Sequence, residues 1–386
     1  MPKTSADVAF INPEILTWAI KASGQSKTLV ASKVKVDPEQ IASWEAGIPP
    51  PFAKAQDLAK ALHLPFGYLF LPEVPAEDLP IPDFRTLGHG YHPPSVEFLQ
   101  LLNEVLVRQD WYRDHLRESS PRLAKLKFIG SFTSKDKVTD VATSIRNTLG
   151  LTADLRSGVG SWSEYLSTIT RHAETGGILV MRSSIVGNTT QYKISPKEVQ
   201  GFAVTDPYAP VVFVNSADYK AAQIFTLIHE LAHLWINQSA ITNPDPLKPS
   251  ANPVEAFCNR VAATALVPQG EFLNGWEASE RGATRISALA RRFWVSTLVV
   301  LRRAHDLDLL SDIEFHQLRS AELKKISDGK KSSGGDYYRN VTARMGARFT
   351  NAVLGEVNRK ALLLTHGAQL LSLSVPTLAK FAEMSR

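Results

Sequence analysis

The stretch FTLIHELAHLWI, residues 225–236, places two histidines four positions apart inside an otherwise apolar run. Apolar residues recur through it at spacings of three and four, which is the pattern of an α-helix that buries one face. On such a helix His229 and His233 project within about 40° of each other, one turn apart. The segment therefore predicts a helix that packs its apolar arc on a core and directs two imidazoles to one point.

This pair of histidines indicates a metal site. Two imidazoles so placed can direct their ring nitrogens at one tetrahedral Zn²⁺, with bonds of about 2.0 to 2.1 Å. Glu230, directly after the first histidine, projects beside that point, where its carboxylate can take a proton from water. The alternative is a pair of polar residues on an ordinary helix surface. The His-Glu-x-x-His order within an apolar helix favours zinc, with Glu230 as general base.

A third protein ligand is needed, because a catalytic zinc site keeps its fourth position for water. The segment NPVEAFCNRVAATALVP, residues 252–268, predicts a helix that starts at Asn252 and Pro253. Glu255 should point inward and is the first candidate ligand. A capping box, in which Glu255 bonds to the backbone of Asn252, is the competing explanation. The other candidate ligands are Cys258, Asn259, His172, His305 and His316.

Composition limits the class of protein. A chain of 386 residues with 44% hydrophobic and 21% charged residues is typical of a globular protein with two or three domains. No apolar run reaches the roughly 18 residues of a membrane span, and the start MPKTSADVAF lacks the apolar core of a signal peptide. The single cysteine forms no internal disulfide. We therefore expect a cytoplasmic protein without membrane contact.

The hydrophobic pattern divides the chain into four parts. Residues 1–72 contain short amphipathic helices, and residues 73–119 a proline-rich, extended connector followed by a helix over 95–118. Residues 120–310 mix β-like runs, GGILVM and APVVFVN, with helices, and residues 311–386 are helical again around the linker SDGKKSSGGD. The expected fold is α+β and mostly helical: an all-α domain, an α+β domain and a helical C-terminal region.

Basic residues are concentrated at the C-terminal end. Residues 317–386 hold 12 Lys and Arg against 5 Asp and Glu, whereas residues 1–316 hold 31 against 33. A solvated helical surface explains this excess, and a contact with DNA or an acidic partner is the alternative. The last segment, THGAQLLSLSVPTLAKFAEMS, has the rhythm of a helix-turn-helix, although a helical hairpin packed on the body is the favoured interpretation.

Three segments carry a resemblance to a known family. They are GFAVTDPYAPVVFVNSADYKAAQIFTLIHELAHLWI, EAFCNRVAATALVP and ISALARRFWVSTLVVLRRAHDLDLL, in this order over residues 200–310. Together they resemble the ImmA/IrrE family of zinc metallopeptidases. The resemblance implies that His229, His233 and Glu255 bind zinc, that Glu230 is the catalytic base and that the fold is a minimal zincin. Members are known for cleaving helix-turn-helix repressors, which implies a transcriptional repressor as the protein substrate.

Residues 12–71 resemble the lambda-repressor-like, XRE-type helix-turn-helix domain. Ala31 would lie in the first helix of the motif, Val36 in the turn, and Ile41 and Trp44 in the core. The connector LPIPDFRT and the segment SSGGDYYRNVTARMGARF are similar to parts of longer chains in which an XRE domain precedes an ImmA/IrrE peptidase.

In DNA-binding members of this class, the second helix of the motif reads bases in the major groove. Here that helix carries Asp37 and Glu39, and residues 1–72 hold 7 Lys and Arg against 6 Asp and Glu. A strong operator binder is more basic, so docking to another protein or dimerisation stands beside DNA binding. The candidate DNA contacts are Lys27, Lys33, Lys35, Gln40 and Ser43.

Three functions fit these observations. The first is a zinc endopeptidase that cleaves a transcription factor. The second is a DNA- or protein-binding regulator, or antitoxin-like protein, whose peptidase fold binds without turnover. The third, a general housekeeping peptidase, does not explain the N-terminal domain. Glu230 favours the first over the second, because a fold used only for binding has no chemical need for that base.

Overall fold

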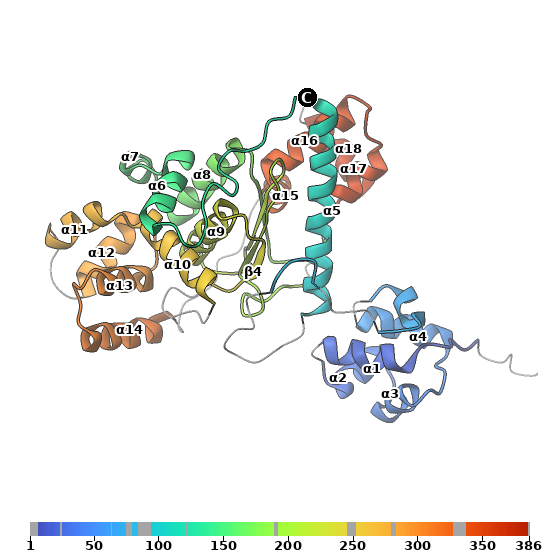
Figure 1. Cartoon of the computed structure of the whole chain (residues 1–386). Coiled ribbons are helices and arrows are strands. Elements are labelled where there is room, and N and C mark those ends of the chain that lie inside the picture. The colour runs from blue at the N-terminus through green and yellow to red at the C-terminus, as the bar shows by residue number, and fades with distance from the viewer. Residues whose placement is uncertain are drawn as a thin grey trace, which may run out of the picture. The chain divides into compact units, whose positions relative to one another are not determined.

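The computed structural model describes residues 7–23, 25–62, 64–74, 79–83, 94–120, 122–188, 192–244, 252–278, 283–326 and 337–384. Within these ranges helices predominate around one four-stranded sheet (Figure 1), which confirms the expected mostly helical α+β fold. None of the described helices combines the length and apolar character that a membrane span requires. The predicted linker at 327–336 and most of the proline-rich connector lie outside the described residues.

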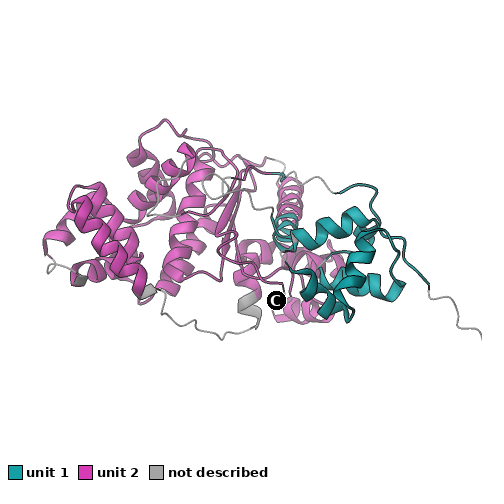
Figure 2. Cartoon of the chain, turned by 90° about the horizontal axis from the view of Figure 1, so that it is seen from below, with its two compact units in different colours: residues 1–80, 91–104 teal, residues 81–90, 105–386 magenta. Residues whose placement is uncertain are grey.

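The chain divides into two compact units (Figure 2). The first comprises residues 1–80 and 91–104, and the second comprises residues 81–90 and 105–386. Helix α5, Val96–Ser119, is the helix expected over 95–118, and it continues from the first unit into the second. The four-part division of the sequence at residues 72, 119 and 310 stays a prediction.

The first unit is helical. Its elements are α1 Pro13–Ala22, α2 Lys27–Val34, α3 Pro38–Glu45, α4 Phe52–Ala61 and the 3₁₀ helix η1 Phe66–Phe70. Helix α2 ends at Val34, and the C-cap residue Lys35 has a left-handed backbone with φ 58°, so the chain turns sharply into α3. As predicted, Ala31 lies in α2, Val36 lies in the turn after it, and Ile41 and Trp44 are in the apolar core; Ala31 is buried in the same cluster.

The second unit contains the sheet. Its strands are β1 Leu179–Ser183, β2 Gly201–Val204, β3 Val211–Asn215 and β4 Ala240–Thr242, in the order β1-β3-β2-β4. Strand β1 runs parallel to β3, while β2 is antiparallel to both β3 and β4. The predicted runs GGILVM and APVVFVN correspond to β1 and β3. Strands β2 and β4 were not predicted individually, because four and three residues are too few for a clear alternation.

Thirteen further helices are described in the second unit. They are α6 Val138–Leu149, α7 Ala153–Ser157, α8 Trp162–Thr175, α9 Lys220–Trp235, α10 Pro253–Leu266, α11 Gln269–Ala278, α12 Ala283–Phe293, α13 Thr297–Asp306, α14 Asp312–Ile326, α15 Tyr337–Met345, α16 Ala347–Asn358, α17 Leu364–Leu370 and α18 Val375–Met384. Helix α9 packs on β2 and β3 and against α6, α8 and α10. Every residue from 223 to 235 is buried, so the side of α9 that carries the histidines is also enclosed.

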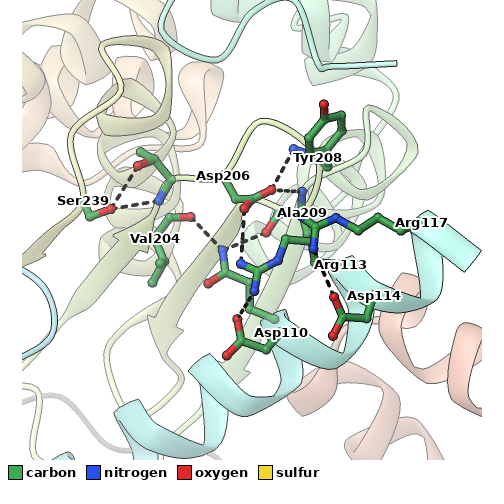
Figure 3. A network of polar contacts seen from close by, with 11 residues as sticks. Asp110, Arg113, Asp114, Arg117, Val204, Asp206, Tyr208, Ala209 and Ser239 are labelled. Carbon is green, nitrogen blue, oxygen red and sulfur yellow. Dashed lines mark hydrogen bonds and ion pairs between the residues drawn. The ribbon is translucent and has the colours of Figure 1, made fainter. Parts of the chain in front are cut away.

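Polar contacts fix α5 to the turn between β2 and β3 (Figure 3). The buried Gln109 amide donates to the carbonyl of Ala209 at 2.8 Å. Arg113 pairs with Asp110 at 2.6 Å on the same helix and with Asp206 at 3.4 Å in the turn. Asp206 in turn accepts from the backbone N–H of Ala209 at 2.8 Å. Hydrogen bonds inside the turn and contacts from α5 therefore both stabilise the turn.

The C-terminal helices pack on the body of the second unit. Helices α17 and α18 contact each other and α16, and the buried Arg108 of α5 donates to the carbonyl of Leu370 at 2.9 Å. This arrangement agrees with the helical hairpin expected for the last segment. Arg348 donates to the carbonyl of Glu174 at 2.9 Å, and Arg344 donates to the carbonyl of Gly187 at 3.1 Å. Part of the basic excess of residues 317–386 therefore serves internal contacts.

Candidate metal centre

Two neighbouring helices of the second unit supply the candidate ligands. His229 and His233 lie on α9, and Glu255 lies in the first turn of α10. Helix α10 begins as its sequence predicts, with the Asn252 side chain accepting from the N–H of Val254 at 2.9 Å and Pro253 in the first turn. Small alanines on α10 are buried in the same core as α9, which lets the two helices pack closely.

Three donor groups converge between these helices. The Nε2 atoms of His229 and His233 are 3.2 Å apart. The two oxygens of Glu255 lie 3.2 Å from the Nε2 of His229 and 3.0 Å from that of His233. Among the described residues this is the one group of His, Cys, Asp and Glu whose donor atoms come together as metal ligands do. Two imidazoles and a carboxylate suit zinc, so the residues fit the metal that the sequence predicts.

The protonation states also fit metal binding. Burial acts to raise the pKa of Glu255, but the charges and hydrogen bonds of His229 and His233 outweigh it and lower that pKa to about 2. Burial lowers the pKa of His233, with the neighbouring His229 acting in the same direction. A ligand carboxylate must be ionised and a ligand imidazole neutral, so the pKa shifts of Glu255 and His233 are both in the direction that ligation requires.

The alternative ligands are placed differently. Cys258 is buried near the site, and burial together with the charges of Glu255 and Glu230 raises the pKa of its thiol well above the usual value, so it stays protonated. His172 contacts the carbonyl of Leu149 at 2.6 Å. The remaining positions are His305, which contacts Asp312 at 2.7 Å, the exposed His316, and the half-buried Asn259. The Asn252 side chain supplies a capping hydrogen bond at the start of α10. The Glu255 carboxylate, which a capping box would also use, contacts both imidazoles.

Glu230 lies in the same buried core without joining the three donor groups. Its Oε1 accepts a hydrogen bond from the hydroxyl of Thr242 on β4, and its Oε2 has no hydrogen-bond partner among the described residues. Burial raises the pKa of Glu230 well above the usual value; the Thr242 bond opposes the rise and the charge of Glu255 adds to it. A carboxylate with a raised pKa is a stronger base. Glu230 therefore has one oxygen held and one oxygen available for proton transfer.

Thr242 and Gly201 are two functional positions that the sequence analysis missed. They face each other across the β2–β4 pair, below Glu230. A Cβ at Gly201 would lie 2.6 Å from the Thr226 methyl and 2.7 Å from Oε1 of Glu230, so only glycine lets β2 approach α9 this closely. No local sequence pattern marks either residue. Both lie on paired strands, and each contacts Glu230 on α9, which is distant in sequence from β2.

Comparison with known families agrees with this geometry. Residues 173–305 match the family model described as the IrrE N-terminal-like domain, peptidase M78, and this range holds the whole sheet, α9 and α10. Over residues 173–305 the chain is therefore similar to the IrrE N-terminal-like domain. The family is one of metallopeptidases, which implies a metal ion, typically zinc, for the three donor groups. No curated protein matches the chain.

The side chains of the candidate site are enclosed within the second unit. His229, Glu230 and His233 are fully buried, and Glu255 is 5% exposed. A peptide substrate therefore has no direct access to these side chains in this conformation. The same enclosure keeps bulk water from the metal ligands and strengthens electrostatic interactions inside the site.

The candidate DNA contacts lie on and beside α2 and α3 of the first unit. Lys27 forms an ion pair with Glu45 at 2.6 Å, and Lys33 donates to the Gln25 side chain at 2.6 Å. Gln40 accepts from the backbone N–H of Asp37 at 3.2 Å. The half-buried Ser43 donates to the carbonyl of Gln40 at 2.7 Å, while Lys35 is exposed. Four of the five side chains are therefore engaged in contacts within the unit.

Proposed function

We propose that the chain is a cytoplasmic zinc endopeptidase that acts in transcriptional regulation by cleaving a helix-turn-helix repressor or a related regulator. The observation that carries this proposal is the position of Glu230. It is buried beside two imidazoles and a carboxylate without being one of the three donors, and one of its oxygens is held by Thr242. A site that only binds a metal has no use for such a base.

The proposed chemistry assigns a role to each residue. His229, His233 and Glu255 would hold the zinc ion, which polarises a peptide carbonyl and lowers the pKa of water when bound. Glu230 accepts the proton of the attacking water at Oε2, while the water oxygen bonds to the carbonyl carbon. Glu230 then gives this proton to the amine nitrogen as the C–N bond breaks. Thr242 acts through Glu230 by keeping Oε1 in place.

The regulatory role rests on the resemblance of residues 12–71 to an XRE-type domain and on the helical first unit, which is compatible with it. In this proposal the first unit recognises the regulator or its DNA, and the second unit carries out the cleavage. The alternative function is a DNA- or protein-binding regulator, or antitoxin-like protein, that works without turnover. The complete burial of His229, Glu230 and His233 favours this alternative.

The direct test is to find what the zinc-loaded protein cleaves. Incubated with a lysate of its own cells, or co-expressed with helix-turn-helix regulators encoded near it, the protein should produce discrete fragments of one regulator, identified by mass spectrometry. A zinc chelator added before the incubation should prevent the cut. Fragments that appear equally with the chelator would come from another protease and would remove the support for the enzyme.

Thr242 provides a prediction for a positioning residue. Thr242→Val keeps the shape of the side chain but removes the hydroxyl that holds Oε1 of Glu230, so we expect the cleavage rate to fall by about tenfold or more, since a hydrogen bond to a charged group contributes about 1.5 to 3 kcal/mol. Thr242→Ser keeps the hydroxyl and should restore most of the rate. Zinc content should stay unchanged in both variants. Equal rates for the valine and serine variants would show that Thr242 has only a packing role.

The first unit leads to a prediction about DNA. Because α3 carries two acids and the Lys27 side chain is paired, the full chain should bind DNA without sequence preference and with a Kd of about 10⁻⁴ to 10⁻⁶ M at physiological salt, with residues after 316 contributing much of the affinity. Fluorescence anisotropy at several salt concentrations measures this. A tight complex with one sequence, weakened by Gln40→Ala, would instead assign base reading to α3.

A further inference from the structure

A cavity of about 360 Å³ lies outside the candidate metal centre, between α7, α11 and the end of α12. None of the candidate zinc ligands lines it. Its size is within the range of small-molecule sites. Its wall includes three arginines, Arg156, Arg291 and Arg292, together with the carboxylates of Asp154 and Glu271. The charges of these side chains give the cavity a net positive wall.

Arg156 is the buried part of this wall, with only 4% of its side chain exposed. Its Nη2 pairs with Glu271, its guanidinium lies 5.5 Å from the centre of the Phe293 ring, and its carbonyl accepts from the indole N–H of Trp294 at 2.9 Å. The Nη1 atom is buried and has no hydrogen-bond partner among the described residues. A buried N–H donor without an acceptor is costly, so Arg156 is held in place with one donor unsatisfied.

A second donor lies next to it. The Tyr165 hydroxyl is buried close to the Arg156 guanidinium, which acts on it through its charge and a side-chain hydrogen bond. Burial raises the pKa of Tyr165, while the nearby Arg156 guanidinium acts against the rise. The tyrosine therefore keeps its proton and offers an O–H donor close to Arg156. The guanidinium and the hydroxyl both carry hydrogen-bond donors, and a negatively charged oxygen is the acceptor that suits such groups.

The other two arginines are available at the solvent side of the cavity. Arg291 and Arg292 are exposed on the last turn of α12, and no described carboxylate forms an ion pair with either. The Glu271 carboxylate is already paired with Arg146 and Arg156. Asp154 is exposed and is the acidic group in the wall that would oppose an anion. The exposed guanidinium groups of Arg291 and Arg292, the latter 5.9 Å from the centre of the Phe293 ring, outweigh this single negative charge.

Trp294 completes the wall with an apolar surface. It follows α12 directly and has a left-handed backbone with φ 55°, a conformation that favours glycine at the end of a helix. Its ring meets Trp162 edge-on at 4.9 Å and donates to Arg156. The tryptophan is thus held in an unfavourable backbone conformation in which its indole lines the cavity beside three arginines.

We propose that this cavity binds a small molecule through an oxyanion group, a phosphate or a carboxylate, with Arg156, Arg291 and Arg292 as the recognition residues and Trp294 as the apolar contact. Guanidinium groups bind both kinds of oxyanion in a planar, two-pronged geometry. The site is separate from the proposed peptidase chemistry and does not depend on it. A bound oxyanion would accept hydrogen bonds from the guanidinium groups that line the cavity.

Thermal unfolding of the full zinc-loaded chain tests this proposal, with inorganic phosphate and succinate as separate probes and sodium chloride at equal ionic strength as the reference. A ligand that binds only the folded state raises Tm as its concentration exceeds Kd. We expect at least one probe to raise Tm above the chloride reference, and the probe that does so identifies the preferred oxyanion. The absence of a shift with both probes would overturn the proposal.

Variants localise the effect. Arg291→Ala with Arg292→Ala changes exposed residues and should weaken binding of the effective probe at least tenfold, whereas Arg171→Ala removes an exposed arginine of α8 outside the cavity and should leave binding unchanged. Arg156→Lys keeps the charge but loses the fork and should weaken binding as well. If that variant fails to fold, the surface pair still decides. A shift that persists in the Arg291/Arg292 variant would assign the anion to another site and overturn the proposal.

Discussion

Replacing Glu230 with glutamine should abolish visible cleavage of the protein substrate while leaving the fold and the zinc content nearly unchanged. Glutamine has the same shape and still accepts the Thr242 hydrogen bond through its carbonyl oxygen, but its amide cannot take a proton from water. Loss of a general base costs about 10² to 10⁴ in rate. The measurement is the cleavage rate of the identified regulator by wild type and by Glu230→Gln at equal zinc content.

The control is Glu277→Gln, which makes the same chemical change on an exposed residue of α11 and should cleave at the wild-type rate. Glu230→Gln should still bind the regulator, since the base does not contribute to recognition. If wild type and Glu230→Gln relieve repression equally, turnover is irrelevant and the binding function takes the place of the enzyme.

The second large effect concerns the metal. The purified protein should contain about one zinc per chain, as expected for a site with three protein ligands. His229→Ala should lose it, because one of three donors disappears and a buried site cannot recruit a replacement. Glu255→Ala should weaken zinc binding by more than the about 10- to 100-fold that the loss of an outer hydrogen-bond partner costs. Elemental analysis after dialysis against graded chelator concentrations measures both changes.

His316→Ala serves as the matched control, since His316 is exposed and was an alternative ligand on sequence grounds. It should keep its full zinc content. Glu255→Ala with full zinc and full activity would show that the Glu255 carboxylate serves the start of α10 and that the third ligand lies elsewhere. Circular dichroism of each variant separates loss of metal from loss of fold.

The features of the candidate site that the structure bears out are those encoded within one helix. The spacing of His229 and His233 places both on one side of α9 in any helical conformation, and Asn252 with Pro253 marks the start of α10 before any packing is known. The apolar run of α9 also indicated a buried helix. These features depend on residues at most four positions apart, so local periodicity and capping are sufficient to find them.

The choice between a ligand and a capping residue at Glu255 needed more than the sequence. Both interpretations fit the same helix start. They differ in whether the Glu255 side chain contacts the start of its own helix or residues of a neighbouring helix. The structure places α9 there, with both imidazoles 3.0 to 3.2 Å from the carboxylate oxygens. The resemblance to a metallopeptidase family implied the same answer, but the physical reason is the packing of two helices that brings Glu255 to histidines 22 and 26 positions earlier in the sequence.

Only the tertiary structure determines the contacts between residues that are far apart in the sequence. Thr242 reaches Glu230 because β4 pairs with β2 beneath α9, and a three-residue strand has too short a pattern to be recognised. The oxyanion cavity joins Arg156 to Glu271 and Trp294, which are 115 and 138 positions further along the chain. Periodicity reports which face of one element is buried, but not which distant element covers it, so these contacts are determined by the packing of the whole unit.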